Sequence, residues 1–183
     1  MINSGNRNTQ TRFIDTPLTH AWQGWLGQRT RCLEQFYSEV RLPADRYSSA
    51  GLHAAEHSLL ALFPESTVPE PIATFLAGCD RLAVERYARY FGEVLVASLD
   101  GYWHNDPAPE HPDRIRATIV FEYTDARIHV TDWVHRALRA RDGRVWASLH
   151  AGLSEWCSVW WQSGRATRLA AGDPAPEAER ING

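Results

Sequence analysis

The chain has 183 residues, of which 44% are hydrophobic and 22% are charged, and its formal net charge is −3. This length and composition fit one globular domain and exclude a disordered chain, a collagen-like repeat and a membrane protein, because no stretch reaches the roughly 20 apolar residues of a spanning helix. All the basic residues are arginine. Mechanisms that need a catalytic lysine are therefore excluded.

The charge is uneven along the chain. Residues 33–110 carry 5 arginines and 12 acidic residues, whereas residues 111–168 carry 9 arginines and 6 acidic residues. An acidic middle argues against nucleic-acid binding, which needs a continuous basic surface.

The three cysteines are far apart and no CxxC pair occurs. The first 16 residues contain no apolar leader segment. Together these features predict reduced thiols and a cytoplasmic location. We expect a flexible arm over residues 1–14, one globular domain over residues 15–169, and a disordered tail over residues 170–183.

Helical periodicity predicts helices over residues 17–40, 51–63, 72–99, 132–141 and 145–161, and Gly78 is a candidate for a break in the third. Thr16 is expected to cap the first helix, Ser48 or Ser49 the second, and Thr131 the helix that begins at Asp132.

Strand signals follow the third helix. Residues 115–123 alternate between apolar and polar side chains, and shorter strands are predicted near 102–104 and 127–130. The predicted fold class is α+β, a single domain in which several helices pack on a small antiparallel sheet.

One pattern carries a resemblance. The residues Tyr90-Phe91-Gly92-Glu93 on a helix precede Gly101-Tyr102-Trp103 in a strand. This arrangement resembles a group of small uncharacterised bacterial α+β proteins, over about a quarter of the chain. The resemblance implies a fold but no activity. We expect Gly92 to permit close helix packing and Glu93 to lie opposite the apolar face, in line with Glu85 and Arg89.

The sequence His53-Ala54-Ala55-Glu56-His57 matches the inverted zinc-protease motif HxxEH. On a helix the two histidines lie at i and i+4 and could bind one Zn²⁺, while Glu56 could act as a general base. Glu93 and Glu122 are the candidates for a further acidic ligand. The competing interpretation is a helix with flanking polar histidines.

Two further segments are candidates for binding. The predicted strand near 102–104 and the proline-rich loop that follows it hold Trp103, His104, Asp106 and Glu110, and the predicted helix 132–141 and its turn hold Arg136, Arg139 and Arg141. Eight tryptophans are a high number, and tryptophan beside arginine is typical of interface hot spots. The competing interpretation is a solvated loop and an ordinary charged helix.

These patterns favour a non-enzymatic interaction protein, such as an immunity protein that neutralises a toxin, with no cofactor and with neither a nucleic acid nor a membrane as partner. The oligomeric state is not predicted. The alternative is a small zinc-dependent hydrolase that uses the motif at 53–57. A third possibility is a ligand-binding domain with an aromatic pocket.

Overall fold

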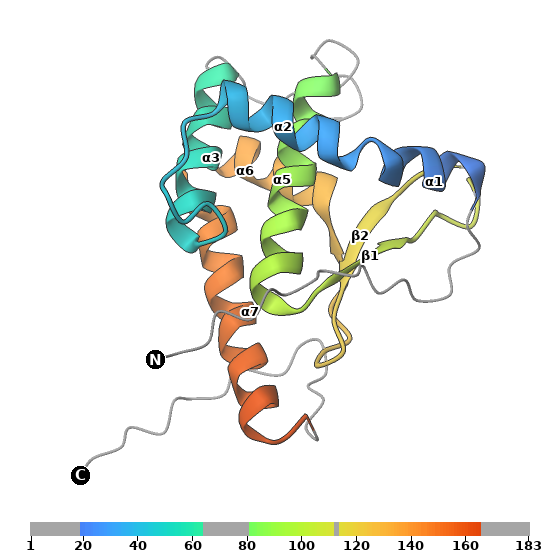
Figure 1. The fold of residues 1–183 in the computed structure, drawn as a ribbon, viewed down its shortest axis with the longest axis vertical. Coiled ribbons are helices and arrows are strands. Elements are labelled where there is room, and N and C mark those ends of the chain that lie inside the picture. The colour runs from blue at the N-terminus through green and yellow to red at the C-terminus, as the bar shows by residue number, and fades with distance from the viewer. Residues whose placement is uncertain (1–18, 64–80, 112–113, 166–183) are drawn as a thin grey trace.

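The computed structural model describes residues 19–63, 81–111 and 114–165. Within these ranges the predicted α+β architecture is confirmed, since helices pack on a small three-stranded antiparallel sheet (Figure 1). The predicted arm over 1–14 and tail over 170–183 lie outside the described residues, as do Thr16, Cys79 and the first part of the predicted helix 72–99.

The first predicted helix is broken in two. Helix α1 spans His20–Gly27 and helix α2 spans Arg29–Glu39. Gln28 separates them, and its amide donates to the carbonyls of Trp25 and Leu26. The hydroxyl of Thr19 accepts a hydrogen bond from the amide of Trp22 at 3.2 Å and so caps α1.

Helix α3, Ser49–Leu62, confirms the second predicted helix, and Ser48 caps it by accepting a hydrogen bond from the amide of Gly51. Helix α5, Arg81–Leu99, is the central element of the fold, because α2, α3, α6, α7 and the sheet all contact it. In Figure 1 the sheet lies on one side of α5, and α3 and α7 lie on the other.

The sheet has the order β1-β2-β3. Strand β1 is Tyr102–Asn105, β2 is Ala117–Val120 and β3 is Ile128–His129. No strand of this sheet is longer than four residues. Of the predicted strand 115–123, only residues 117–120 form a strand.

Register divides the sheet into two faces. Trp103 pairs with Ile119, which pairs with Ile128, and these three buried side chains form the core face toward the helices. Because side chains alternate along a strand, His104, Thr118 and His129 form the neighbouring row on the opposite face.

Helix α6, Val130–Ala140, follows β3 directly, and helix α7, Val145–Gln162, closes the fold. The predicted cap Thr131 lies inside α6, whose first flanking residue, His129, makes no side-chain cap. Arg141 ends α6 in the left-handed conformation with φ of 55°. The predicted helix over 145–161 is confirmed by α7.

One face of α5 differs from the prediction. Arg89 and Glu93 are buried, with 1% and 3% of their surface exposed, although they were expected to face solvent with Glu85. Arg89 pairs with Glu85 one turn earlier, at 2.8 Å. Glu93 instead pairs with Arg29 of α2 and accepts a hydrogen bond from the indole of Trp103 at 2.7 Å.

Arg89 lies in an aromatic cluster that covers the same face. Its guanidinium stands 3.7 Å from the ring centroid of Trp25 and donates to the carbonyl of that residue at 2.8 Å. Trp25 also stacks on Trp22 and meets Trp103 edge to face. The arginine is therefore satisfied within the core and joins α1 to α5.

Candidate functional site: the polar face of the sheet

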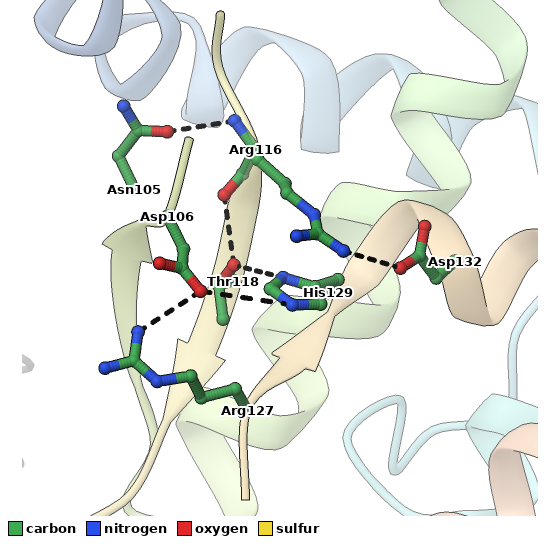
Figure 2. A network of polar contacts seen from close by, with 7 residues as sticks. All are labelled: Asn105, Asp106, Arg116, Thr118, Arg127, His129 and Asp132. Carbon is green, nitrogen blue, oxygen red and sulfur yellow. Dashed lines mark hydrogen bonds and ion pairs between the residues drawn. The ribbon is translucent and has the colours of Figure 1, made fainter. Parts of the chain in front are cut away.

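The face of the sheet that points away from the core carries a connected set of polar side chains. We call this set the polar sheet face. Figure 2 shows Asp106, Arg116, Thr118, Arg127, His129 and Asp132, together with Asn105, which by register lies on the same side as Trp103 but joins the set because its side chain accepts a hydrogen bond from the amide of Arg116. They come from all three strands, the residues that flank them and the first turn of α6, so the antiparallel register is what brings them together.

Thr118 lies at the centre of this set (Figure 2) and is fully buried. Its hydroxyl donates to the carbonyl of Arg116 at 3.0 Å and lies 2.7 Å from Nδ1 of His129. A hydroxyl has one proton. If that proton goes to the carbonyl, Nδ1 of His129 carries the proton of the second contact, which leaves Nε2 as the acceptor.

Asp106 links two neighbours across the face. Its Oδ2 lies 3.2 Å from Nη1 of Arg127 and 3.9 Å from Nε2 of His129. The backbone amide of Asp106 also donates to the carbonyl of Arg116, which extends the pairing of β1 with β2 by one step. The carboxylate is therefore held in place by its own backbone as well as by the arginine.

A second ion pair ties the sheet to α6. Nη2 of Arg116 lies 3.3 Å from Oδ2 of Asp132, and the amide of Arg116 donates to the side-chain oxygen of Asn105 at 2.9 Å (Figure 2). Both charged side chains are about half exposed. Exposed pairs of this kind contribute only about 0–1 kcal/mol to stability, so they order the surface more than they stabilise the fold.

Burial favours the neutral form of the histidines on this face. Burial lowers the pKa of His129, and Arg116 and Arg127 lower it further, while Asp132 and Asp106 act in the opposite direction. The pKa of His104, in the same row, is lowered by burial and by Arg127. At neutral pH the formal charges of the face therefore come from two arginines and two aspartates.

A threonine beside a histidine and an aspartate suggests nucleophilic catalysis, but the geometry does not support it. Thr118 is buried, so no substrate atom can reach its oxygen. The distance of 3.9 Å between His129 and Asp106 also exceeds hydrogen-bond range. The arrangement builds a rigid surface rather than an activated hydroxyl.

The structure places the predicted binding residues in different environments. Asp106 belongs to the polar sheet face, and His104 lies beside it in the row that it forms with Thr118 and His129. Glu110 is exposed in the following loop. Trp103 is 2% exposed and belongs to the core, so its assignment to a binding surface is corrected. A strand places alternate residues on opposite faces, and the register puts Trp103 on the inner one.

The predicted arginines of α6 also separate. Arg136 is exposed and stacks over the ring of Trp133 at 4.7 Å, and Arg139 is exposed in the last turn. Arg141 donates to the carbonyls of Phe63 and Leu60 at 2.9 and 3.4 Å, so it satisfies the end of α3. Its role in the fold is therefore structural.

Helix α3 places the histidines and the glutamate of the HxxEH motif on different sides. His53 and His57 are on the exposed side of α3. Glu56 is completely buried, and its two oxygens accept hydrogen bonds from the backbone amides of Val145 and Trp146 at 3.1 and 2.9 Å. It caps the beginning of α7. Both oxygens are buried and directed at these amides rather than at a solvent-exposed site, which weakens the case for a zinc hydrolase.

A hollow of about 700 Å³ lies between the ends of α2 and α3 and the beginning of α5. Its lining is mainly apolar and includes an ion pair of Glu39 with Arg86 at 3.1 Å and a hydrogen bond of Ser58 with Tyr87 at 2.9 Å. Phe63, which precedes residues outside the described ranges, is one of its lining residues.

Sequence reasoning singled out His104 and Asp106 but missed Arg116, Thr118, Arg127 and His129. A signal for two of them was present. If the apolar residues of 115–123 face the core, Arg116 and Thr118 must face outward. His129 and Arg127 could be added only once the register of the short strand β3 was known.

Among the described helices, none has both the length and the apolar character that crossing a bilayer requires. In comparisons with protein-family models, with curated proteins and with solved structures, nothing matches this chain.

Proposed function

We propose that this protein is a non-enzymatic interaction protein that binds another protein through the polar sheet face, in the manner of an immunity protein that neutralises a toxin. The observation that carries the proposal is the interlocked pair of ion pairs on that face, Arg127–Asp106 and Arg116–Asp132. A surface whose charges are already ordered loses less side-chain entropy on binding than one whose arginines are mobile.

The chemistry of the surface suits a protein partner. Each guanidinium uses one nitrogen for its aspartate, and a guanidinium has further N–H groups that fit a carboxylate. Positive and negative groups alternate across the face, so a complementary partner would carry alternating charges in matching positions. Such a pattern favours specificity, because a shifted partner brings like charges together.

The location supports the proposal further. The face is built on paired strands and continues through Asp132 onto α6, where Arg136 is exposed one turn later. Sites on regular elements hold their geometry better than sites on loops. The surface therefore unites parts of the two segments that the sequence predicted to bind.

The test uses immobilised protein and two charge-reversal variants. R116E/R127E reverses the two positive charges of the polar sheet face. R31E/R41E makes the same change of charge at exposed positions on and just after α2. A protein bound by the wild type and by R31E/R41E should be bound at least about 10-fold more weakly by R116E/R127E.

Hydrogen exchange on the same complex should show slower exchange in β1 and in the Arg127–Asp132 segment. A partner retained equally by both variants, or protection confined to other elements, would contradict the proposal. The melting temperatures of both variants should stay close to that of the wild type, because half-exposed ion pairs contribute little stability.

A further inference from the structure

The two histidines of the HxxEH motif remain unexplained once Glu56 is assigned to the cap of α7. His53 and His57 lie one turn apart on α3, and their Nε2 atoms are 3.1 Å from each other. The rings are nearly perpendicular, at 85°, with centroids 4.4 Å apart. Both side chains are exposed, so solvent can reach the edge of this pair.

The position of one ring is fixed by a neighbouring turn. Gly143 lies between α6 and α7 with φ of 68°, and a Cβ at this position would lie 2.8 Å from both Cε1 and Nε2 of His57. The missing side chain therefore provides the space in which the imidazole lies. Glu56, on the buried side of the same helix, holds α3 against α7.

We propose that His53 and His57 form a two-histidine chelating site for a borderline transition-metal ion such as Zn²⁺, Ni²⁺ or Cu²⁺. A metal ion lies about 2.0–2.1 Å from an imidazole nitrogen, and nitrogens 3.1 Å apart then subtend about 100° at the ion. This angle lies between the values of about 90° and about 109° for square-planar and tetrahedral coordination.

Binding needs only a small change in the rings. In the present contact one nitrogen donates to the other, whereas a metal ion requires a lone pair from both. A shift of the donor's proton from Nε2 to Nδ1, with a rotation of the ring, provides the second lone pair without loss of a proton. Imidazole ligands exclude Mg²⁺ and Ca²⁺, which take oxygen.

The site differs from that of a zinc hydrolase. The described residues contain no group of three or more side chains suited to hold a metal ion, so water or a group from a partner completes the coordination. Glu56 supplies no ligand and no general base. The proposal is independent of the function proposed above, since α3 contributes nothing to the polar sheet face.

The experiment titrates Zn²⁺, and in a second series Ni²⁺, into untagged protein at pH 7.5 by calorimetry. We expect one ion per chain, and at least about 10-fold weaker binding by H53A and by H57A, because each leaves a single donor in place of a chelate. H111A, which removes an exposed histidine from a loop, is the matched control and should bind as the wild type does.

A second variant tests the geometry while keeping both ligands. G143A should displace the ring of His57 and weaken binding, provided that its unfolding curve shows a folded protein. Proton spectra should show both imidazoles shifting with Zn²⁺ in the wild type. Absence of saturable binding by the wild type, or unchanged affinity in both H53A and H57A, would overturn the proposal.

Discussion

The indole of Trp103 occupies the space that a side chain on Gly92 would need. A Cβ at position 92 would lie 2.1 Å from the Cη2 atom of that ring. The indole nitrogen then donates to Glu93, the next residue on α5. The glycine and the glutamate of the Tyr-Phe-Gly-Glu pattern thus both contact Trp103 of β1. Gly92 leaves space for the side chain of a strand residue, whereas the sequence suggested close packing of another helix.

Replacing Gly92 with alanine should destabilise the protein by about 1–3 kcal/mol or more, because the ring of Trp103 has no free volume into which to move. The free energy of unfolding is measured by urea titration. G152A is the control, since Gly152 also lies in a helix but has nothing within 4 Å of its added Cβ. There the substitution should stabilise by up to about 1 kcal/mol.

Replacing Glu93 with alanine should cost about 1–3 kcal/mol, because it leaves the buried indole N–H of Trp103 without its acceptor, whereas Arg29 is about one-third exposed and can turn toward solvent. E93Q retains one oxygen and should cost less. R29A removes the cation from the buried Glu93 carboxylate and leaves it the indole N–H as donor, so this variant should cost more, about 3–5 kcal/mol. Equal stability of E93A and wild type in urea would refute this account.

Glu56 gives a pH dependence of definite sign. Burial raises its pKa above the ordinary value of 4.5, against the lowering effect of the two amides of α7. At pH values between the pKa of Glu56 in the unfolded state and its higher pKa in the folded state, the folded state binds more protons. This group therefore makes stability fall as pH rises.

The corresponding variant is E56Q, which keeps one acceptor for the two amides and cannot ionise. It should be less stable than the wild type by about 1–3 kcal/mol. The difference should be largest near pH 4.5 and decrease at higher pH. Urea titrations between pH 4.5 and 7 measure it, and a difference that grows with pH would contradict the sign.

Four histidines make stability rise with pH, which is the opposite of the effect of Glu56. Burial lowers the pKa values of His104, His129, His135 and His150 below 6.5. As pH falls through 6.5 the unfolded chain takes up protons that the folded chain resists, so stability is lost. Comparison of unfolding at pH 7.5 and 5.5 should show this loss.

H135L isolates one contribution to that loss. His135 is buried, and its Nε2 has no hydrogen-bond partner among the described residues. The leucine variant should lose less stability than the wild type between pH 7.5 and 5.5. An identical loss in the two proteins would mean that His135 does not contribute.

Local patterns predicted helices α3 and α7 almost to the residue, because caps and apolar periodicity are properties of neighbouring residues. The burial of Arg89 and Glu93 was missed for the opposite reason. Their partners Trp25 and Arg29 each lie 64 residues away in sequence, and periodicity assigns any charged residue to the surface. For the polar sheet face, His104 and Asp106 were found from sequence. The outward position of Arg116 and Thr118 follows from the alternation along β2, whereas Arg127 and His129 required the register of β3.

The cap that Glu56 provides for α7 also constrains when the chain can fold. Glu56 is synthesised 89 residues before the amide of Val145 that it accepts. Until that amide emerges from the ribosome, burying the apolar side of α3 would bury a carboxylate without its donors, which is costly. We therefore expect folding to be completed only after α7 has been translated, so that a nascent chain ending before Val145 stays sensitive to protease.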